Sequence, residues 1–163
     1  MKKQIAIFVL LSTALASLGL TLAKVDGPDN PPRAALDEYL SFLELPNPKP
    51  VRDELFHEDV VGYWSRGQTF IGRDAVVSEI RKAIEGDSKI VKSMKFDVET
   101  SQERVFDDGA WLGGIINIRV EMNDGRKFVR SIRMTLVLTE KDDTWQIVHE
   151  HSSLLNEKFT NGL

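Results

Sequence analysis

Residues 145–153, near the C-terminus, read WQIVHEHSS and are the most informative stretch of the chain. Their aromatic and β-branched residues are typical of a β-strand. Residues i and i+2 of a strand share one face, whereas residue i+1 points to the other face. We therefore expect His149 and His151 on one side of a strand and the carboxylate of Glu150 on the opposite side.

The overall composition is that of an ordinary globular protein. The chain has 163 residues, of which 42% are hydrophobic and 28% are charged, so one folded domain with one core is expected. The formal net charge is −4 and no basic stripe is present. Because phosphate binding needs clustered Lys and Arg, we expect no nucleic-acid partner.

The N-terminus differs from the rest of the chain. Lys2 and Lys3 precede an apolar run that starts at Ile5, and small-residue sites follow at 14–16 and 21–23. This layout predicts a signal peptide over residues 1–23 and a periplasmic or secreted protein. The apolar stretch 5–23 has 19 residues, so an uncleaved anchor is the alternative, and the membrane would be contacted through this segment alone. The chain has no cysteine, so an exported domain would be stabilised without disulfides.

Helices are expected in the first half of the chain. Residues 24–33 are rich in turn formers and predict a linker. Apolar residues at helical spacing predict a helix over 34–45, which the prolines from Pro46 onward would end, and a short helix over 51–56. Another helix is expected to begin at Asp74 and to end at Gly86.

Strands dominate the second half. The pattern predicts an α+β fold in which a curved antiparallel sheet follows the helices. The strands are expected over residues 57–64, 69–71, 89–100, 103–106, 110–122, 127–139 and 144–155.

Several motifs together resemble a known superfamily. They are Phe56 with Val60, the helix start at Gly72-Arg73, and Arg133-Met134-Thr135 followed by residues 145–153. These motifs are similar to the SnoaL-like branch of the nuclear transport factor 2 (NTF2) superfamily, and the same ending resembles the association (hub) domain of calcium/calmodulin-dependent protein kinase II. The predicted domain covers residues 34–157. The resemblance implies a cone-shaped sheet wrapped around the N-terminal helices, one pocket at its open end, and a homodimer or larger homo-oligomer. It implies no single activity, since members include isomerases, cyclases, dehydratases and binding or assembly modules.

The hairpins set which side chains meet across the sheet. Matching the apolar faces of strands 110–122 and 127–139 requires an odd loop at 123–125, with Gly125 in a left-handed conformation. A second turn centred on 141–142 would pair Leu136 with Ile147 and Met134 with His149. In that register Arg133 lies directly across from Glu150 and Ser131 lies across from Ser152, which gives a cross-strand pair of opposite charges.

Together with this register, the resemblance implies a binding site for a small molecule, such as one that bears a carboxylate. Arg119 and Arg133 align with two arginines of the hub pocket, whereas a third hub arginine would fall at Ser152. A guanidinium presents a fork of donors to an anion. The predicted ligand-binding residues are Tyr63, Trp64, Arg119, Arg133, Glu150 and Ser152.

Other functions stay open at this point. A ketosteroid-isomerase-like enzyme would use Glu150 as a base and Tyr63 or a histidine as the oxyanion donor, but a facing Arg133 should lower the pKa of Glu150. An assembly module is the other alternative. His149 and His151 could bind a metal, yet the sequence supplies no third ligand, so core or interface histidines are favoured. We therefore expect no metal and no cofactor.

Overall fold

A computed structural model describes residues 31–65, 67–142 and 144–159. The predicted signal peptide over 1–23 and most of the predicted linker lie outside these residues. Residues 31–33, which were expected to be linker, instead form the first turn of helix α1. Within the described part of the chain, no helix is long and apolar enough to cross a membrane.

Two α-helices and one short 3-10 helix are present in the described residues. Helix α1 spans Pro31–Leu43, the 3-10 helix η1 spans Asp53–Leu55, and helix α2 spans Arg73–Ile90. The prediction that α2 ends at Gly86 is wrong. The helix continues for one more turn, where Lys89 forms an ion pair with Glu85 at 2.9 Å. Pairs at this spacing support a helix, and a single exposed glycine costs only about 1 kcal/mol there.

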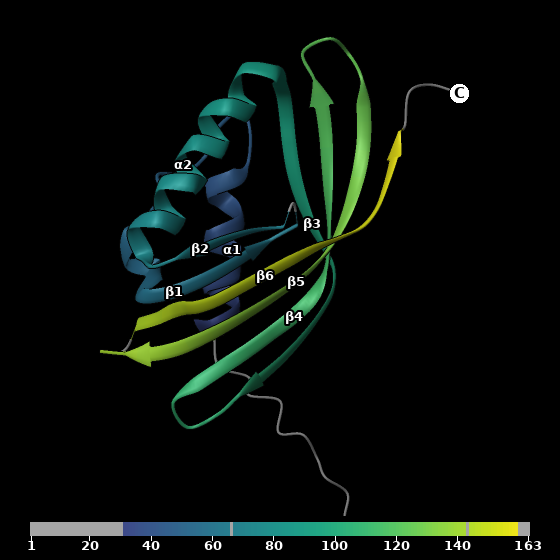
Figure 1. Cartoon of the computed structure of the whole chain (residues 1–163). Helices are drawn as coiled ribbons and strands as arrows, with labels where there is room; N and C mark the ends of the chain where they lie inside the picture. Colours follow the sequence, from purple (N-terminus) through teal and green to yellow (C-terminus); the bar gives the residue numbers. More distant parts are fainter. Residues whose placement is uncertain (1–30, 66, 143, 160–163) are drawn as a thin grey trace, which may run out of the picture.

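Six strands of the described chain form one curved sheet in the order β2-β1-β6-β5-β4-β3 (Figure 1). All neighbours are antiparallel except β1 and β6, which run parallel. The predicted α+β fold with a curved sheet is therefore confirmed. Residues 89–100 and 103–106 were predicted as two strands, but residues 89 and 90 end helix α2 and residues 91–105 form one long strand. The strands are β1 Phe56–Trp64, β2 Gln68–Ile71, β3 Val91–Val105, β4 Gly109–Met122, β5 Lys127–Lys141 and β6 Thr144–Phe159.

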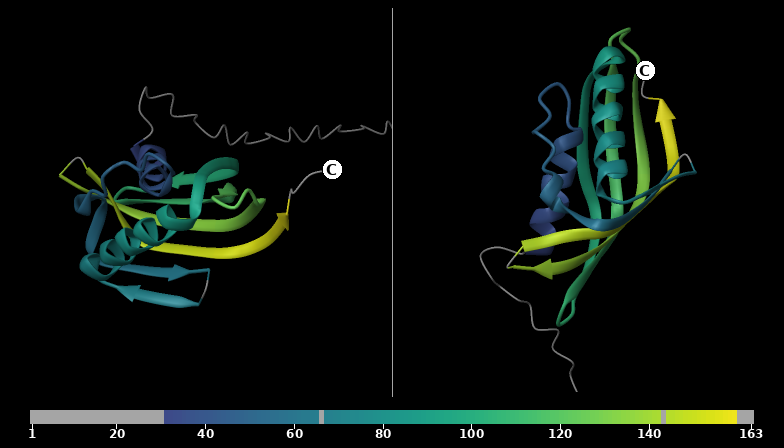
Figure 2. Two further views of the ribbon diagram at one scale, coloured as in Figure 1. Left: turned by 90° about the horizontal axis from the view of Figure 1, so that it is seen from above. Right: turned by 60° about the vertical axis from the view of Figure 1, so that its left-hand side comes forward.

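The core lies between the helices and the concave face of the sheet (Figure 2). Ile80 of α2, Phe56 of β1 and Ile147 of β6 are completely buried there. Apolar residues at even positions of β4 and β5 supply the opposite wall, as the alternation of those strands predicts. Hydrophobic burial thus holds both helices against one face of the sheet.

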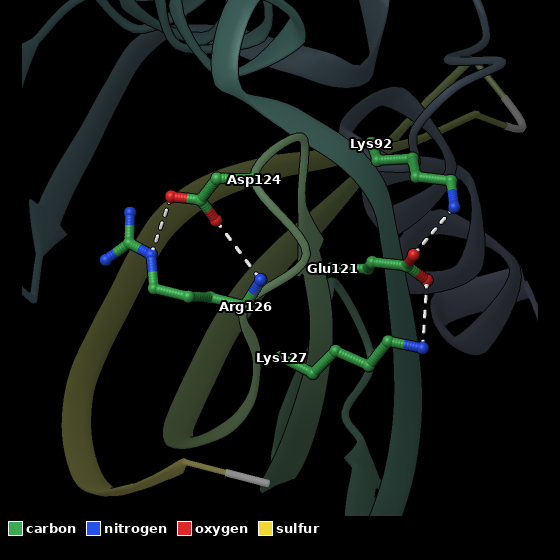
Figure 3. Close-up of polar contacts among 5 residues, drawn as sticks. All are labelled: Lys92, Glu121, Asp124, Arg126 and Lys127. Carbon is green, nitrogen blue, oxygen red and sulfur yellow. Dashed lines mark hydrogen bonds and ion pairs between the residues drawn. The ribbon is translucent and has the colours of Figure 1, made fainter. Parts of the chain in front are cut away.

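The β4–β5 hairpin has the predicted three-residue loop. The amide of Gly125 donates to Met122, and Gly125 has a φ of 88°. Asp124 accepts hydrogen bonds from the backbone amide and the side chain of Arg126, at 3.1 and 2.8 Å (Figure 3). Glu121 lies between Lys92 and Lys127, and these contacts lower its pKa. The predicted face assignment of both strands is therefore correct.

The sheet is strongly bent along its length (Figure 1), and the antiparallel pairing of β3 with β4 is irregular in its middle part. A bulge in β3 separates the pairs formed by Val98 and Thr100. A Cβ atom added to Gly114 of β4 would lie 2.2 Å from the backbone oxygen of Thr100. Because a side chain cannot fit there, glycine permits the close approach of the two strands.

The predicted register of the last hairpin is wrong. Lys141 pairs with Thr144, and Leu138 pairs with Ile147 instead of the predicted Trp145. A bulge then follows, because Leu138 pairs with Ile147 whereas the next pair joins Val137 to His149. The bulge exchanges the two faces of β6 from His149 to Leu154, and a second register shift follows before Asn156.

The shifted pairing and this bulge together separate the predicted partners of the hairpin. Glu150 lies opposite Leu136 on the core face, and Arg133 lies opposite Ser153 on the convex face. Ser152 faces Met134, and Ser131 pairs with Asn156. The expected cross-strand pair of Arg133 and Glu150 therefore does not form.

Candidate functional site

A pocket opens between the helices and the concave face of the sheet. Its cavity volume is about 180 Å³, and its walls come from α1, α2 and strands β1, β3, β4, β5 and β6. The walls are mostly apolar, with Tyr39, Phe96 and Met134 among them. Glu150 and Ser152 enter from β6 because the bulge turns these residues inward.

Glu150 is the most unusual side chain of this pocket. It is only 3% exposed, and its Oε2 atom has no hydrogen-bond partner among the described residues. Burial raises the pKa of the carboxyl to about 8. The hydroxyl of Ser152 and the indole of Trp64 lower this pKa, but by less than burial raises it. Desolvation dominates because a buried carboxylate loses water and gains no cation here. Glu150 therefore holds a proton near neutral pH.

Tyr39 approaches the same region from α1. Its side chain is buried and packs edge to face on Phe56, with the ring centres 6.0 Å apart. Burial raises the pKa of Tyr39 well above its usual value, and the charge of Glu150 adds to that rise. The phenol therefore stays neutral and can act as a hydrogen-bond donor or acceptor.

An ion pair lies at the part of the wall contributed by β5. The Nε and Nη2 atoms of Arg130 both donate to Oε2 of Glu157, at 2.8 and 2.6 Å. The guanidinium also lies over the ring of Phe128, 5.5 Å from its centre. The positive charge of Arg130 is thus largely neutralised by a partner on β6.

The structure brings three of the six predicted site residues into this pocket. Trp64, Glu150 and Ser152 line its wall. Tyr63 points to the convex face, since the neighbouring residue of a strand takes the opposite side. Arg119 and Arg133 are exposed and also lie on the convex face, where Arg119 forms an ion pair with Asp97. The two arginines therefore do not converge on the pocket.

Tyr39 and Arg130 are among the pocket residues that the sequence reasoning missed. Tyr39 appeared only as one apolar position of the first helix, and Arg130 lies on an otherwise apolar face of β5. Arg130 could have been predicted, because it is a charged residue among the apolar even positions of β5. No local pattern could show that Tyr39 and Glu150 line the same pocket, because one residue belongs to α1 and the other to β6.

The two histidines lie in a separate hollow on the convex side. His149 and His151 line it together with Tyr63, whose ring centre is 5.5 Å from that of His149. Burial lowers the pKa of His149, and the neighbouring His151 lowers it further. The expectation that these histidines share a face with Ile147 and Met134 is wrong. Among the residues that the structure describes, no three His, Cys, Asp or Glu side chains cluster as metal ligands.

Solved structures with a similar fold share little sequence with this chain. An uncharacterised protein of Caulobacter vibrioides with a cystatin-like fold is 21% identical, with a TM-score of 0.63, and the match covers 77% of this chain and 88% of that one. A hexachlorocyclohexane dehydrochlorinase of Novosphingobium barchaimii is 8% identical, with a TM-score of 0.66 and coverage of 82% and 90%. A proposed calcium/calmodulin-dependent protein kinase II association domain from Xanthomonas campestris is 21% identical, with a TM-score of 0.53 and coverage of 63% and 71%. These similarities establish the fold alone.

Sequence comparison identifies the family. No curated protein matches the chain. The family model of the SnoaL-like domain matches residues 34–157. The sheet, the helices and the concave pocket agree with this match, and the predicted resemblance to the SnoaL-like and NTF2-like proteins is confirmed. The chain therefore belongs to the SnoaL-like domain family.

Proposed function

We propose that the protein binds a small molecule in the concave pocket and that Glu150 contacts the polar group of this ligand. The observation that carries the proposal is the buried Oε2 atom of Glu150, which has no partner among the described residues and belongs to a pocket wall. Leaving a buried polar group unpaired costs about 1–3 kcal/mol. A carboxyl held in this state at an apolar pocket is typical of a ligand site.

A carboxylate-bearing ligand was expected from Arg119 and Arg133, but these residues lie on the opposite face of the sheet. Arg130, the arginine that does line the pocket, is paired with Glu157. The pocket also contains the carboxyl of Glu150, which would repel an anion when ionised. We therefore favour a ligand without negative charge.

A thermal-shift screen of small organic molecules tests the binding function. A ligand at 100 times its Kd should stabilise the protein by about 2.7 kcal/mol and raise its Tm. Ala83 of α2 lines the pocket, so Ala83→Phe should fill the cavity and abolish the shift. Ala75→Phe, an exposed position of the same helix, is the control and should keep the shift. Equal shifts in both variants would place the ligand outside this pocket.

Proton transfer next to a carbonyl is the second candidate function. The pKa of Glu150, raised to about 8, favours it, because a general base works best when its pKa is near the working pH. Arg133 was expected to face Glu150 and to lower its pKa, but in the observed register the two residues are not opposite each other. The cavity of about 180 Å³ suits a single-ring ketone better than a steroid, because about 150 Å³ already accommodates benzene.

Deuterium exchange separates catalysis from binding. A single-ring ketone in D₂O should exchange the protons next to its carbonyl faster with wild type than with Glu150→Gln, as followed by NMR. If the two proteins exchange at the same rate, the protein is a binding module without this chemistry.

The cellular setting of the domain is also a proposal. The layout of residues 1–23 supports export to the periplasm or outside the cell, or anchoring through this segment. Sequencing the N-terminus of protein from the native host would show the residue at which the chain begins. Membership of the SnoaL-like family supports a homodimer or larger homo-oligomer.

A further inference from the structure

The charges around the pocket limit which ligands it can accept. Among the described residues of the wall, the charged types are Asp87, Arg130 and Glu150. Arg130 is paired with Glu157, and Asp87 has an interaction of its own. Oε2 of Glu150 accepts no hydrogen bond from the described residues, although Ser152 and Trp64 lie close enough to lower the pKa of the carboxyl. The pocket therefore presents an unsatisfied acceptor.

An ammonium group matches the ionised form of this carboxyl in both charge and hydrogen bonding. It carries N–H donors and no acceptor, and charge-assisted hydrogen bonds to a carboxylate are about twice as strong as neutral ones. An anion would meet the carboxyl of Glu150 without a cation to offset it. A neutral donor would form a hydrogen bond with Oε2 of Glu150 but would not neutralise the negative charge of the ionised carboxylate.

Aromatic walls favour the same class of ligand. Tyr39, Trp64 and Phe96 line the pocket from α1, β1 and β3. A cation within about 6 Å of an aromatic ring centre is attracted by the ring face. The cavity of about 180 Å³ limits the apolar body to about one ring, since about 150 Å³ accommodates benzene.

We propose that the ligand of the concave pocket is a small organic ammonium ion with an apolar body of about one ring, whose N–H groups donate to Oε2 of Glu150. This inference rests on the proposed binding function, because it names the chemistry of the ligand in the same pocket. It differs from the carboxylate predicted from Arg119 and Arg133.

Binding of an ammonium ion should be coupled to proton release. The empty pocket keeps Glu150 protonated at pH 7, because burial raises the pKa of its carboxyl to about 8. The other titratable or charged side chains of the pocket wall are Tyr39 of α1, Asp87 of α2 and Arg130 of β5, which is paired with Glu157. A bound cation stabilises the carboxylate and displaces its proton. Affinity should therefore rise by up to about tenfold per pH unit between pH 6 and 8, while the amine stays protonated.

Calorimetric titration of the full chain with three molecules of matched size tests the proposal. Benzylamine is a cation at pH 7, benzyl alcohol is neutral, and benzoate is an anion. We expect the amine to bind about tenfold or more tighter than the alcohol, and benzoate to bind most weakly. Repeating the amine titration in buffers of different ionisation enthalpy should show close to one proton released per ligand.

Matched variants assign the effect to Glu150. Glu150→Gln keeps the shape of the side chain and should weaken benzylamine binding by about tenfold or more, with little change for benzyl alcohol. Glu140→Gln makes the same change at an exposed position of β5 and should alter neither affinity. Wild-type selectivity and proton release need no variant, so the test survives if Glu150→Gln folds poorly.

The results distinguish failure of the ammonium proposal from failure of ligand binding in the pocket. Binding of benzyl alcohol or benzoate as tight as that of the amine, or amine binding without proton release, overturns the ammonium proposal and leaves pocket binding intact. If none of the three binds and Ala83→Phe leaves every shift of the thermal screen unchanged, both proposals fail.

Discussion

Glu150 connects the stability of this protein to pH. Its pKa is about 8 in the folded state and near 4.5 when the side chain is solvated. Between these values the folded protein binds a proton that the unfolded chain does not, so the free energy of unfolding falls as pH rises. The loss should be on the order of a few kcal/mol and complete above the folded pKa. Urea denaturation at pH 5.5 and pH 8.5 measures it.

Glu150→Gln is the corresponding variant, because glutamine resembles the protonated side chain and does not titrate. It should remove this part of the pH dependence and should be more stable than wild type at pH 8.5. Glu140→Gln controls for loss of an exposed carboxyl. A pH dependence that is the same in wild type and Glu150→Gln would contradict the raised pKa.

The residues of the pocket could be predicted only in part. Strand alternation correctly separated Glu150 from His149 and His151. Which of the two faces met the core depended on an unpaired residue at Val148, and no residue type marks such a bulge in the sequence. This one residue moved Glu150 to the core face, where burial raises the pKa of its carboxyl.

At the scale of elements, the close pairing of β3 with β4 beside the bulge depends on Gly114. Gly114→Ala would bring a Cβ atom to 2.2 Å from the backbone oxygen of Thr100, so the strands must separate. We expect a loss of about 1–3 kcal/mol or more, the usual cost of overpacking. Chemical denaturation of wild type and variant measures the difference. Unchanged stability would mean that β3 and β4 are not closely packed at Gly114.

A glycine-to-alanine substitution in helix α2 should have the opposite effect on stability. Gly86 lies in the helix, and a Cβ atom added there would contact nothing within 4 Å. Gly86→Ala should therefore stabilise the protein by about 0.5–1 kcal/mol, because alanine loses less backbone entropy on folding. The same denaturation experiment tests this expectation, and a loss of stability would contradict it.

The elements themselves were largely predictable, because periodicity and turn residues are local signals. The three-residue loop at Gly125 is an example. The continuation of α2 past Gly86 was not predicted, since a glycine stop signal can be overridden by neighbouring helix contacts such as Lys89 with Glu85. The merging of residues 91–105 into one strand depends on pairing with β4, which is a tertiary effect.

At the scale of the whole molecule, the convex face carries apolar side chains as well as polar ones. Val61, His149, Val137 and Trp111 lie side by side in one row across β1, β6, β5 and β4, and each is half-buried. The helices cover the other face of the sheet, so within the described chain this row has no covering element. Such a surface suits contact with a second copy of the protein.

We therefore expect static light scattering to give at least twice the mass of one chain. Val137→Asp would place a charge within this row, and burying an unpaired charge is costly enough to favour the monomer. Gln102→Asp makes a charge at an exposed position of the edge strand β3 and should leave the mass unchanged. A monomeric wild type, or an oligomer that Val137→Asp does not weaken, would show that this row is not the contact between copies. Because Glu150 points to the opposite face, loss of the oligomer should leave benzylamine binding in the pocket unchanged.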